Sequence, residues 1–171
     1  MISVANERQR ACKRSNAKRK NHPMNISIRK GTEADYPAII NLIHEFALYQ
    51  KTPERVTNSV EQMKSDNNLF QCFVAVDENQ KIVGYAAWFF AYFSWTGKAL
   101  YLDDLYVVES ARGQAIGTRL LQTVIDHART THCVKVRWQV SNWNKPAIAF
   151  YRKMGALIDD VEMNCHFELM H

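Results

Sequence analysis

The chain has 171 residues, of which 47% are hydrophobic and 23% are charged, and its formal net charge is +5. This length is typical of a single domain, and the apolar content is sufficient for a packed core. The sequence has no run of about 18 apolar residues that predicts a spanning helix, and no apolar stretch near its N-terminus that predicts a secretory signal. We therefore expect a cytoplasmic protein without a membrane partner.

The positive charge is concentrated at the N-terminus. Residues 1–23 contain seven of the 22 Lys and Arg residues and one of the 17 Asp and Glu residues, so residues 24–171 are close to neutral. Because this segment also lacks periodic apolar residues, we expect a disordered basic tail before one domain. Three interpretations of the tail are open: an arm that binds nucleic acid or another anionic surface nonspecifically, a targeting segment, or an extension before a domain that begins at Met24.

The cysteines form no metal-ligand pattern. Cys12, Cys72, Cys133 and Cys165 are scattered along the chain, and none belongs to a C-x-x-C pair. We therefore expect free thiols in a reducing compartment and no bound metal.

Hydrophobic periodicity and turn residues divide the domain into strands and helices. The expected strands cover 26–29, 70–76, 82–93, 99–108, 134–140 and 161–169; one helix begins at Thr32, a second follows a cap at Asn58 and Ser59, and two more cover 116–130 and 145–153. The strands before and after helix 116–130 are expected to be parallel neighbours with a right-handed crossover. The fold class is therefore α+β, with a mixed, mostly antiparallel twisted sheet flanked by helices.

The turn between strand 99–108 and helix 116–130 is the strongest functional signal. Unpaired N–H groups and the helix dipole create an anion site at such a helix start, and small residues let a diphosphate approach the backbone. The residues of this predicted cradle are Arg112, Gly113, Gln114, Ala115, Ile116, Gly117 and Thr118. Basic turns between strands and helices are common, however, and many of them bind nothing.

A second block, Asn-Trp-Asn-Lys-Pro-Ala-Ile-Ala-Phe-Tyr-Arg-Lys-Met-Gly-Ala, occupies residues 142–156. Together the two blocks resemble the GNAT superfamily of acetyl-CoA-dependent N-acetyltransferases, whose diphosphate motif is Arg/Gln-x-x-Gly-x-Gly/Ala. The resemblance extends from Ile26 to Leu169 and is greatest for the diamine (spermidine/spermine-type) enzymes, which share the segment 95–102 and an acidic pair. It implies acetyl-CoA as cosubstrate, parallel strands that splay at its site, a small primary amine as acceptor in a ternary complex, and a homodimer.

One residue departs from the family motif, because Ala115 stands at the position of the first glycine. An alanine held at positive φ costs on the order of 1 kcal/mol, whereas an alanine in ordinary helical geometry costs nothing. We expect the diphosphate site to be retained in either case.

Asp103 and Asp104 are adjacent carboxylates in an otherwise apolar strand, where aspartate is disfavoured. Strand alternation places them on opposite faces unless a bulge intervenes, and an edge or solvated position is the alternative to a functional role. The resemblance implies a bulge here, a proton relay from the amine through Asp103, and a place for Asp104 in the substrate site. The diamine enzymes carry Glu at the position of Asp103, so the shorter side chain favours a relay through water.

The resemblance also implies roles for residues on either side of the cradle. Tyr151 matches the tyrosine that protonates the departing thiolate and contacts the cosubstrate, although a tyrosine on this amphipathic helix can also serve in packing alone. Asn144 caps the helix that follows it and contacts the CoA arm. The main chain of Leu105, Tyr106 and Val107 pairs with pantetheine like an additional strand.

The sequence says less about the acceptor. Tyr49 and Trp95 keep aromatic positions of the diamine enzymes, and Glu54 is close to the first of them in the sequence. Gln50 and Phe93, however, replace acids. Fewer carboxylates attract a distal ammonium less strongly, which favours a small monoamine, a thialysine-like amino acid or a short diamine over long polyamines. The alternatives are a protein lysine or N-terminal acetyltransferase and a noncatalytic acyl-CoA-binding module.

Overall fold

The computed structural model describes residues 25–159, so the expected basic tail and the expected strand at 161–169 lie outside the described residues. In chain order the elements are β1 (Ser27–Lys30), η1 (Glu33–Asp35), α2 (Tyr36–Gln50), η2 (Pro53–Arg55), α3 (Val60–Ser65), β2 (Gln71–Val76), β3 (Ile82–Phe93), β4 (Gly97–Val107), η3 (Glu109–Ala111), α4 (Ile116–Thr130), β5 (Val136–Arg137) and α5 (Lys145–Lys153). Three of them, β3, α4 and α5, have the bounds that the sequence predicts. None of the described helices is long and apolar enough to cross a membrane.

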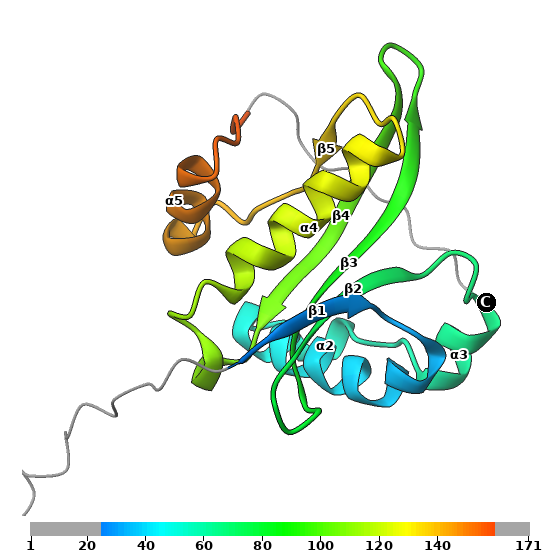
Figure 1. Cartoon of the computed structure of the whole chain (residues 1–171), viewed down its shortest axis with the longest axis vertical. Coiled ribbons are helices and arrows are strands. Elements are labelled where there is room, and N and C mark those ends of the chain that lie inside the picture. Colours follow the sequence, from blue (N-terminus) through cyan, green and yellow to red (C-terminus); the bar gives the residue numbers. More distant parts are fainter. Residues whose placement is uncertain (1–24, 160–171) are drawn as a thin grey trace, which may run out of the picture.

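Five strands form one twisted sheet in the order β1-β2-β3-β4-β5 (Figure 1). The first three pairs are antiparallel, whereas β4 and β5 are parallel and are connected by α4. The mixed, mostly antiparallel sheet that the sequence predicts is therefore confirmed.

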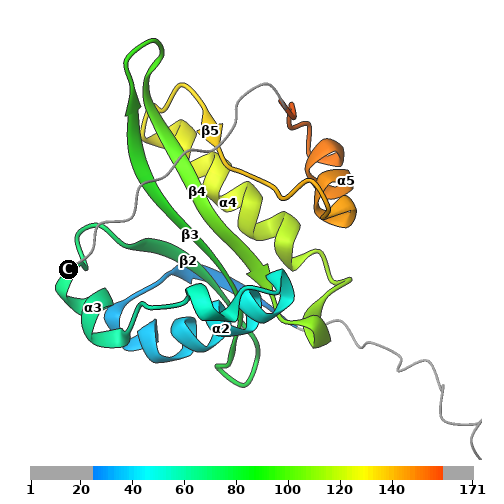
Figure 2. The same ribbon diagram turned by 180° about the vertical axis from the view of Figure 1, so that it is seen from behind.

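Different helices cover the two faces of the sheet (Figures 1 and 2). On one face α2 and α3 enclose a core that contains Ile39, Val74 and Tyr85. On the other face α4 and α5 pack over a second core, in which Leu120 lies with Trp88. The β3–β4 hairpin extends past both helical layers, so its far end is less covered than the rest of the sheet.

The first helix begins with a tight turn that is tied to β1. The sequence predicts a helix from Thr32, but the α-helix starts at Tyr36, after the 3₁₀ turn η1. The Asp35 carboxylate accepts hydrogen bonds from the Thr32 N–H at 2.8 Å and from the Arg29 guanidinium at 2.7 and 2.8 Å. The hydrogen bond from Arg29 lowers the pKa of Asp35 to about 2. This contact connects the turn to β1.

The strand expected at 134–140 is wrong in length, because only Val136–Arg137 is a strand. These two residues pair with Leu100 and Tyr101 of β4. The next residue, Trp138, packs its ring against Tyr151 of α5, with ring centres 5.1 Å apart. The chain thus leaves the sheet to join the α5 side of the core, and β4 and β5 splay apart beyond Tyr101.

Candidate active site

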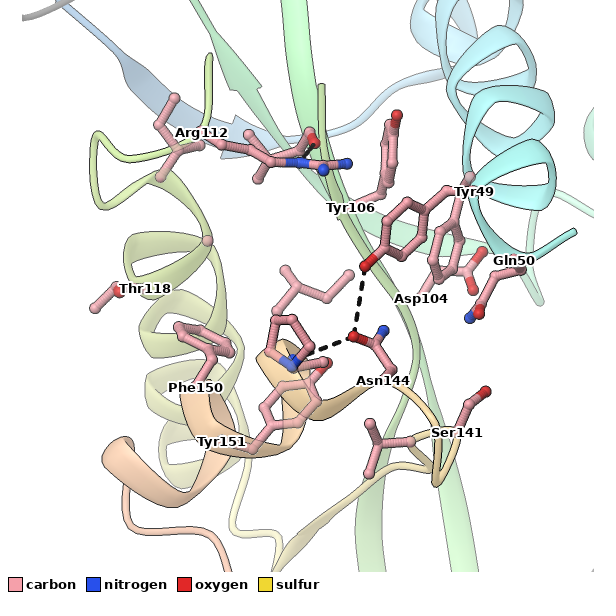
Figure 3. Close-up of a pocket in the computed structure, with 18 of the residues that line it drawn as sticks. Tyr49, Gln50, Asp104, Tyr106, Arg112, Thr118, Ser141, Asn144, Phe150 and Tyr151 are labelled. Carbon is pink, nitrogen blue, oxygen red and sulfur yellow. Dashed lines mark hydrogen bonds between the residues drawn. The ribbon is translucent and has the colours of Figure 1, made fainter. Parts of the chain in front are cut away.

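A cleft of about 820 Å³ lies where β5 diverges from β4. It is enclosed by β4, the N-terminus of α4, α5 and the C-terminal end of α2 (Figure 3). Fourteen predicted site residues line it: Tyr49, Asp103, Asp104, Leu105, Tyr106, Val107, Arg112, Gly113, Ala115, Ile116, Gly117, Thr118, Asn144 and Tyr151. The fold therefore gathers in one place residues that are up to 102 positions apart in the sequence.

The predicted diphosphate cradle forms the start of α4. Gly113, with φ of +80°, and Ala115, with φ of +58°, are both in the left-handed region, and Ala115 is the N-cap of the helix. Of the two geometries open for Ala115 in the sequence, the positive-φ one is therefore correct. This conformation turns the chain sharply enough for the first N–H groups of α4 to lie at the cleft, where they favour an anion.

Arg112 extends from the loop into the cleft (Figure 3). Its Nε donates to the Val107 carbonyl oxygen at 3.0 Å, and its guanidinium lies 5.1 Å from the ring centre of Tyr49 and 5.6 Å from that of Tyr106. The Val107 carbonyl is one of the groups expected to pair with pantetheine. Arg112 therefore occupies one of the two lone pairs of this carbonyl oxygen, and the second can still accept from a chain that pairs along β4.

The edge of β4 opposite β3 is open along the cleft. In the part of the chain that the structure describes, the β4–β5 ladder involves only Leu100 and Tyr101. Leu105, Tyr106 and Val107 pair with β3 on one side and line the cleft on the other. This is the arrangement in which main-chain groups can accept an additional extended chain.

The bulge expected at the acidic pair is confirmed. Ala87 pairs with Asp104 and Trp88 with Leu102, so Asp103 is the extra residue of β4. Both carboxylates consequently line the cleft instead of facing opposite sides of the sheet.

The two carboxylates have different surroundings. The side chain of Asp103 is exposed in the cleft. The surrounding cleft walls still exclude part of its water, and this desolvation raises its pKa. Asp104 is partly buried and accepts a hydrogen bond from the Tyr85 hydroxyl at 2.8 Å. Burial and the negative charge of Asp103 raise the pKa of Asp104 to about 6, although the Tyr85 hydrogen bond lowers it.

Tyr151 lies at the side of the cleft formed by α5 (Figure 3) and is 8% exposed. Its ring packs against Trp138 and Phe150, with ring centres 5.1 and 5.2 Å away. Burial, followed by the charge of Asp104, raises the pKa of Tyr151 to about 12. The hydroxyl therefore stays protonated at neutral pH and can act as a proton donor, while its ring also has the packing role that the sequence left open.

Asn144 connects the two walls of the cleft. Its Oδ1 accepts a hydrogen bond from the Ala147 N–H at 3.2 Å, which caps α5 as predicted, and another from the Tyr49 hydroxyl at 3.5 Å (Figure 3). Asn144 is 7% exposed, so this contact holds the end of α2 against the start of α5.

Three predicted site residues do not line this cleft within residues 25–159: Glu54, Trp95 and Gln114. Glu54 is on η2, and Trp95 is 97% exposed in the turn between β3 and β4. Gln114 belongs to the loop, but its neighbours Gly113 and Ala115 form the lining.

Several lining residues were not singled out in the sequence: Phe46, Gln139, Val140, Ser141, Phe150 and Lys153. Phe46 is three and four residues before Tyr49 and Gln50, so helical spacing places all three on one face. The segment 139–141 gives no such signal, because its position depends on the packing of Trp138. No group of three or more His, Cys, Asp or Glu side chains in residues 25–159 is arranged to hold a metal ion.

The sequence profile described as the acetyltransferase (GNAT) family matches residues 36–156. The chain belongs to this family. It is 35% identical over 140 residues to the thialysine N-epsilon-acetyltransferase of Mus musculus, covering 75% of this chain and 82% of the relative. It is 36% identical over 142 residues to the spermidine/spermine N(1)-acetyltransferase-like protein 1 of Homo sapiens, covering 77% of this chain and 20% of that longer protein.

Solved structures agree on the fold. An aminoglycoside acetyltransferase from an uncultured soil metagenomic sample, in complex with trehalose, superposes with a TM-score of 0.72 at 24% identity, covering 85% of this chain and 97% of that one. An acetyltransferase of Trypanosoma brucei superposes with a TM-score of 0.68 at 20% identity, covering 84% of this chain and all of the other. The protein is thus a GNAT acyltransferase in fold and family.

Proposed function

We propose that this protein transfers the acetyl group of acetyl-CoA to the primary amine of a small molecule, and that its acceptor is a thialysine-like amino acid or a short diamine. The observation that carries the proposal is the composition of the cleft. A helix N-terminus, an open strand edge, two carboxylates and a protonated tyrosine line the same space. Each of these groups meets one requirement of acetyl transfer to an amine.

The cosubstrate half of the cleft suits a diphosphate followed by an extended amide chain. The loop from Gly113 to Thr118 presents helix N–H groups to the diphosphate, and the edge of β4 at Leu105–Val107 offers N–H and C=O groups to pantetheine. Acetyl-CoA supplies the activated thioester. Its arm would run from α4 along β4 towards the carboxylates, where the acetyl group meets the amine.

The reaction needs one proton acceptor and one proton donor. A free ammonium must lose a proton before its nitrogen can attack, and the carboxylates of Asp103 and Asp104 are the acceptors at this end of the cleft. Nitrogen attack forms the C–N bond, the C–S bond then breaks, and the sulfur leaves as a thiolate. Tyr151 donates its hydroxyl proton to that thiolate and is reprotonated by the second proton released from nitrogen.

Positive charge near β5, beyond the residues that line the cleft, favours a small or zwitterionic amine. Phe93 replaces an acid, and its ring lies 4.9 Å from Lys135 Nζ and 5.2 Å from the Arg137 guanidinium. Arg137 pairs with Tyr101, two residues before Asp103 on β4. Positive charge at this position repels the distal ammonium of a long polyamine but attracts the carboxylate of an amino acid. The name of the Mus musculus relative agrees with an amino acid acceptor.

An acceptor panel tests this proposal. Purified protein and acetyl-CoA are incubated with thialysine, lysine, putrescine, spermidine, a lysine-containing peptide and a peptide with a free N-terminus, and CoA thiol release and product mass are followed. We expect the highest kcat/KM for thialysine or putrescine. Acetylation of the peptides alone would favour a protein acetyltransferase, and binding of acetyl-CoA without transfer to any amine would favour a noncatalytic module.

A further inference from the structure

The Asp104 carboxylate accepts a hydrogen bond from the hydroxyl of Tyr85, and no other hydroxyl donor to it is identified in residues 25–159. Tyr85 lies in the middle of β3, is fully buried in the core beneath α2, and donates to Asp104 Oδ2 at 2.8 Å. Tyr85 pairs with Tyr106 while Ala87 pairs with Asp104, so the bond crosses diagonally between β3 and β4 on one face of the sheet. The ladder is regular from Ala87–Asp104 to Gly84–Val107, so ordinary strand alternation places both side chains on this face.

The need of a buried hydroxyl for a hydrogen-bond partner does not by itself explain why residue 85 is a tyrosine. A phenylalanine would fill the same core without any polar group, whereas the tyrosine fixes a carboxylate that lines the cleft. Asp104 and Tyr151 line the same cleft, and the charge of Asp104 contributes to the raised pKa of Tyr151. The carboxylate held by Tyr85 is therefore close to the proton donor of the proposed reaction.

We propose that Tyr85 is a positioning residue that holds Asp104, and that the Asp104 carboxylate, in preference to that of Asp103, accepts the proton of the substrate ammonium. This inference rests on the proposed function, because it concerns a step of amine acetylation. The proton passes from the ammonium nitrogen to Asp104 Oδ before the C–N bond forms. It leaves to solvent after the amide product departs, so the carboxylate is regenerated.

The surroundings of Asp104 suit this role better than those of Asp103. A general base is most effective when its pKa is near the working pH, and burial with the charge of Asp103 raises the pKa of Asp104 to about 6. Asp103 is the more exposed of the two, so it serves as a fixed negative charge that attracts the ammonium. The hydrogen bond from Tyr85 lowers the pKa of Asp104 and so favours the ionised carboxylate, opposing the effects of burial and of the Asp103 charge.

The charged and titratable groups around Asp104 come from several elements of the fold, and both negative and positive charges are among them. Tyr85 approaches it from β3, Asp103 and Tyr106 belong to its own strand, and Tyr151 approaches from α5. From α2, Tyr49 lines the same cleft, and Arg112 lies over the rings of Tyr49 and Tyr106. Among these groups only Arg112 is a cation, and its guanidinium is engaged with Val107.

The test is the pH dependence of kcat/KM for the best amine of the acceptor panel in wild type, Tyr85→Phe and Tyr36→Phe. Tyr36 is a matched control, because it is a buried tyrosine of the same core, packed edge-to-face on Phe70. Loss of the Tyr85 hydroxyl removes a hydrogen bond to the ionised carboxylate, so the acidic limb moves to higher pH. We expect Tyr85→Phe to lose activity about tenfold at pH 6 and less than about twofold at pH 8.5, and Tyr36→Phe to match wild type at both.

A second pair of variants separates the two carboxylates. Asp104→Asn is expected to lower kcat by about 10²-fold or more and to abolish the acidic limb. Asp103→Asn is expected to lower kcat/KM less and to move the acidic limb to lower pH, since it removes a negative charge beside Asp104. A greater loss of kcat in Asp103→Asn than in Asp104→Asn would overturn the inference.

A measurement without substrate keeps this inference distinct from the proposed function. Carboxyl-carbon NMR of protein labelled at aspartate is expected to show a higher pKa for Asp104 in Tyr85→Phe than in wild type. An unchanged titration, or a pH profile of Tyr85→Phe that superimposes on wild type, would overturn the role of Tyr85. A wild-type protein that acetylates no amine would contradict the proposed function, and the titration would still report on the Tyr85–Asp104 contact.

Discussion

Substitution of Gly113 tests the backbone geometry of the diphosphate loop. Gly113 has φ of +80°, and a Cβ added there would meet nothing within 4 Å. Any loss of stability in Gly113→Ala therefore comes from the left-handed backbone itself and not from a steric clash. An L-residue in this region costs about 1–2 kcal/mol, of which up to about 1 kcal/mol is offset by the lower entropy of the unfolded chain. We expect the free energy of unfolding to fall by about 1 kcal/mol.

Gly117 provides a matched control for the same chemical change. It lies four residues later in the first turn of α4, without a positive φ, and its added Cβ would lie 3.9 Å from Val107 Cγ2 and 4.0 Å from Phe150 Cζ. These are ordinary contacts, and alanine is favoured over glycine inside a helix by about 1 kcal/mol. Gly117→Ala is therefore expected to be as stable as wild type or more stable.

Thermal and urea unfolding of the ligand-free proteins measure this difference. For a chain of this length, about 1 kcal/mol corresponds to about 2–4 °C in Tm, so the two variants should differ by about 5 °C. Gly113→Ala is also expected to weaken acetyl-CoA binding, because a backbone strained at residue 113 holds the N–H groups of the loop less firmly towards the diphosphate. A Gly113→Ala protein that is as stable as Gly117→Ala would refute the left-handed geometry of the loop.

Three further predictions concern proton donation, pH stability and the tail. Tyr151→Phe should lower kcat by about 10²–10⁴-fold with little change in acetyl-CoA affinity measured by calorimetry; unchanged turnover would limit Tyr151 to packing. The pKa of Asp35 is lowered to about 2 by its hydrogen bond from Arg29, so its contribution to stability is present above about pH 4 and is lost as the pH falls towards 2. Asp35→Asn should therefore reduce the free energy of unfolding by about 1–2 kcal/mol at pH 7 in a denaturant titration, and should make little difference near pH 2. Deletion of residues 1–23 should leave acetylation of small amines unchanged, and a truncated enzyme that unfolds or loses most activity would contradict the prediction of a dispensable tail.

Local sequence patterns were sufficient for much of the fold. The bounds of β3, α4 and α5 agree with prediction because their periodicity is strong and their ends carry distinct signals, such as the Asn144 cap followed by proline. The length of β5 was not predictable from its own residues. Its alternation continues to residue 140, but the contact of Trp138 with Tyr151 takes the chain off the sheet. That contact joins two segments whose proximity appears only in the tertiary structure.

The sequence predicted which residues form the site better than it predicted their backbone geometry and contacts. The motifs indicated the acidic pair and the cradle, and the structure brings most of these residues to one cleft. The sequence left the φ of Ala115 open, and it gave no reason to connect Tyr85 with Asp104, because that contact depends on the cross-strand register of β3 and β4. The hairpin that carries Trp95 extends past the helices (Figure 1), and Trp95 is not among the residues that line the cleft, an arrangement that local patterns do not encode.

Binding of acetyl-CoA to the ligand-free protein is the sharpest test that the cleft is a cosubstrate site. Thermal unfolding is followed while acetyl-CoA is titrated to millimolar concentration, with CoA as a competitor. A ligand at 100 times its Kd stabilises the folded state by about 2.7 kcal/mol, which for this chain is a rise of about 5–10 °C in Tm. We expect a saturable rise of that size in wild type and a smaller one in Gly113→Ala. An unchanged Tm at millimolar acetyl-CoA would contradict the assignment of the cleft.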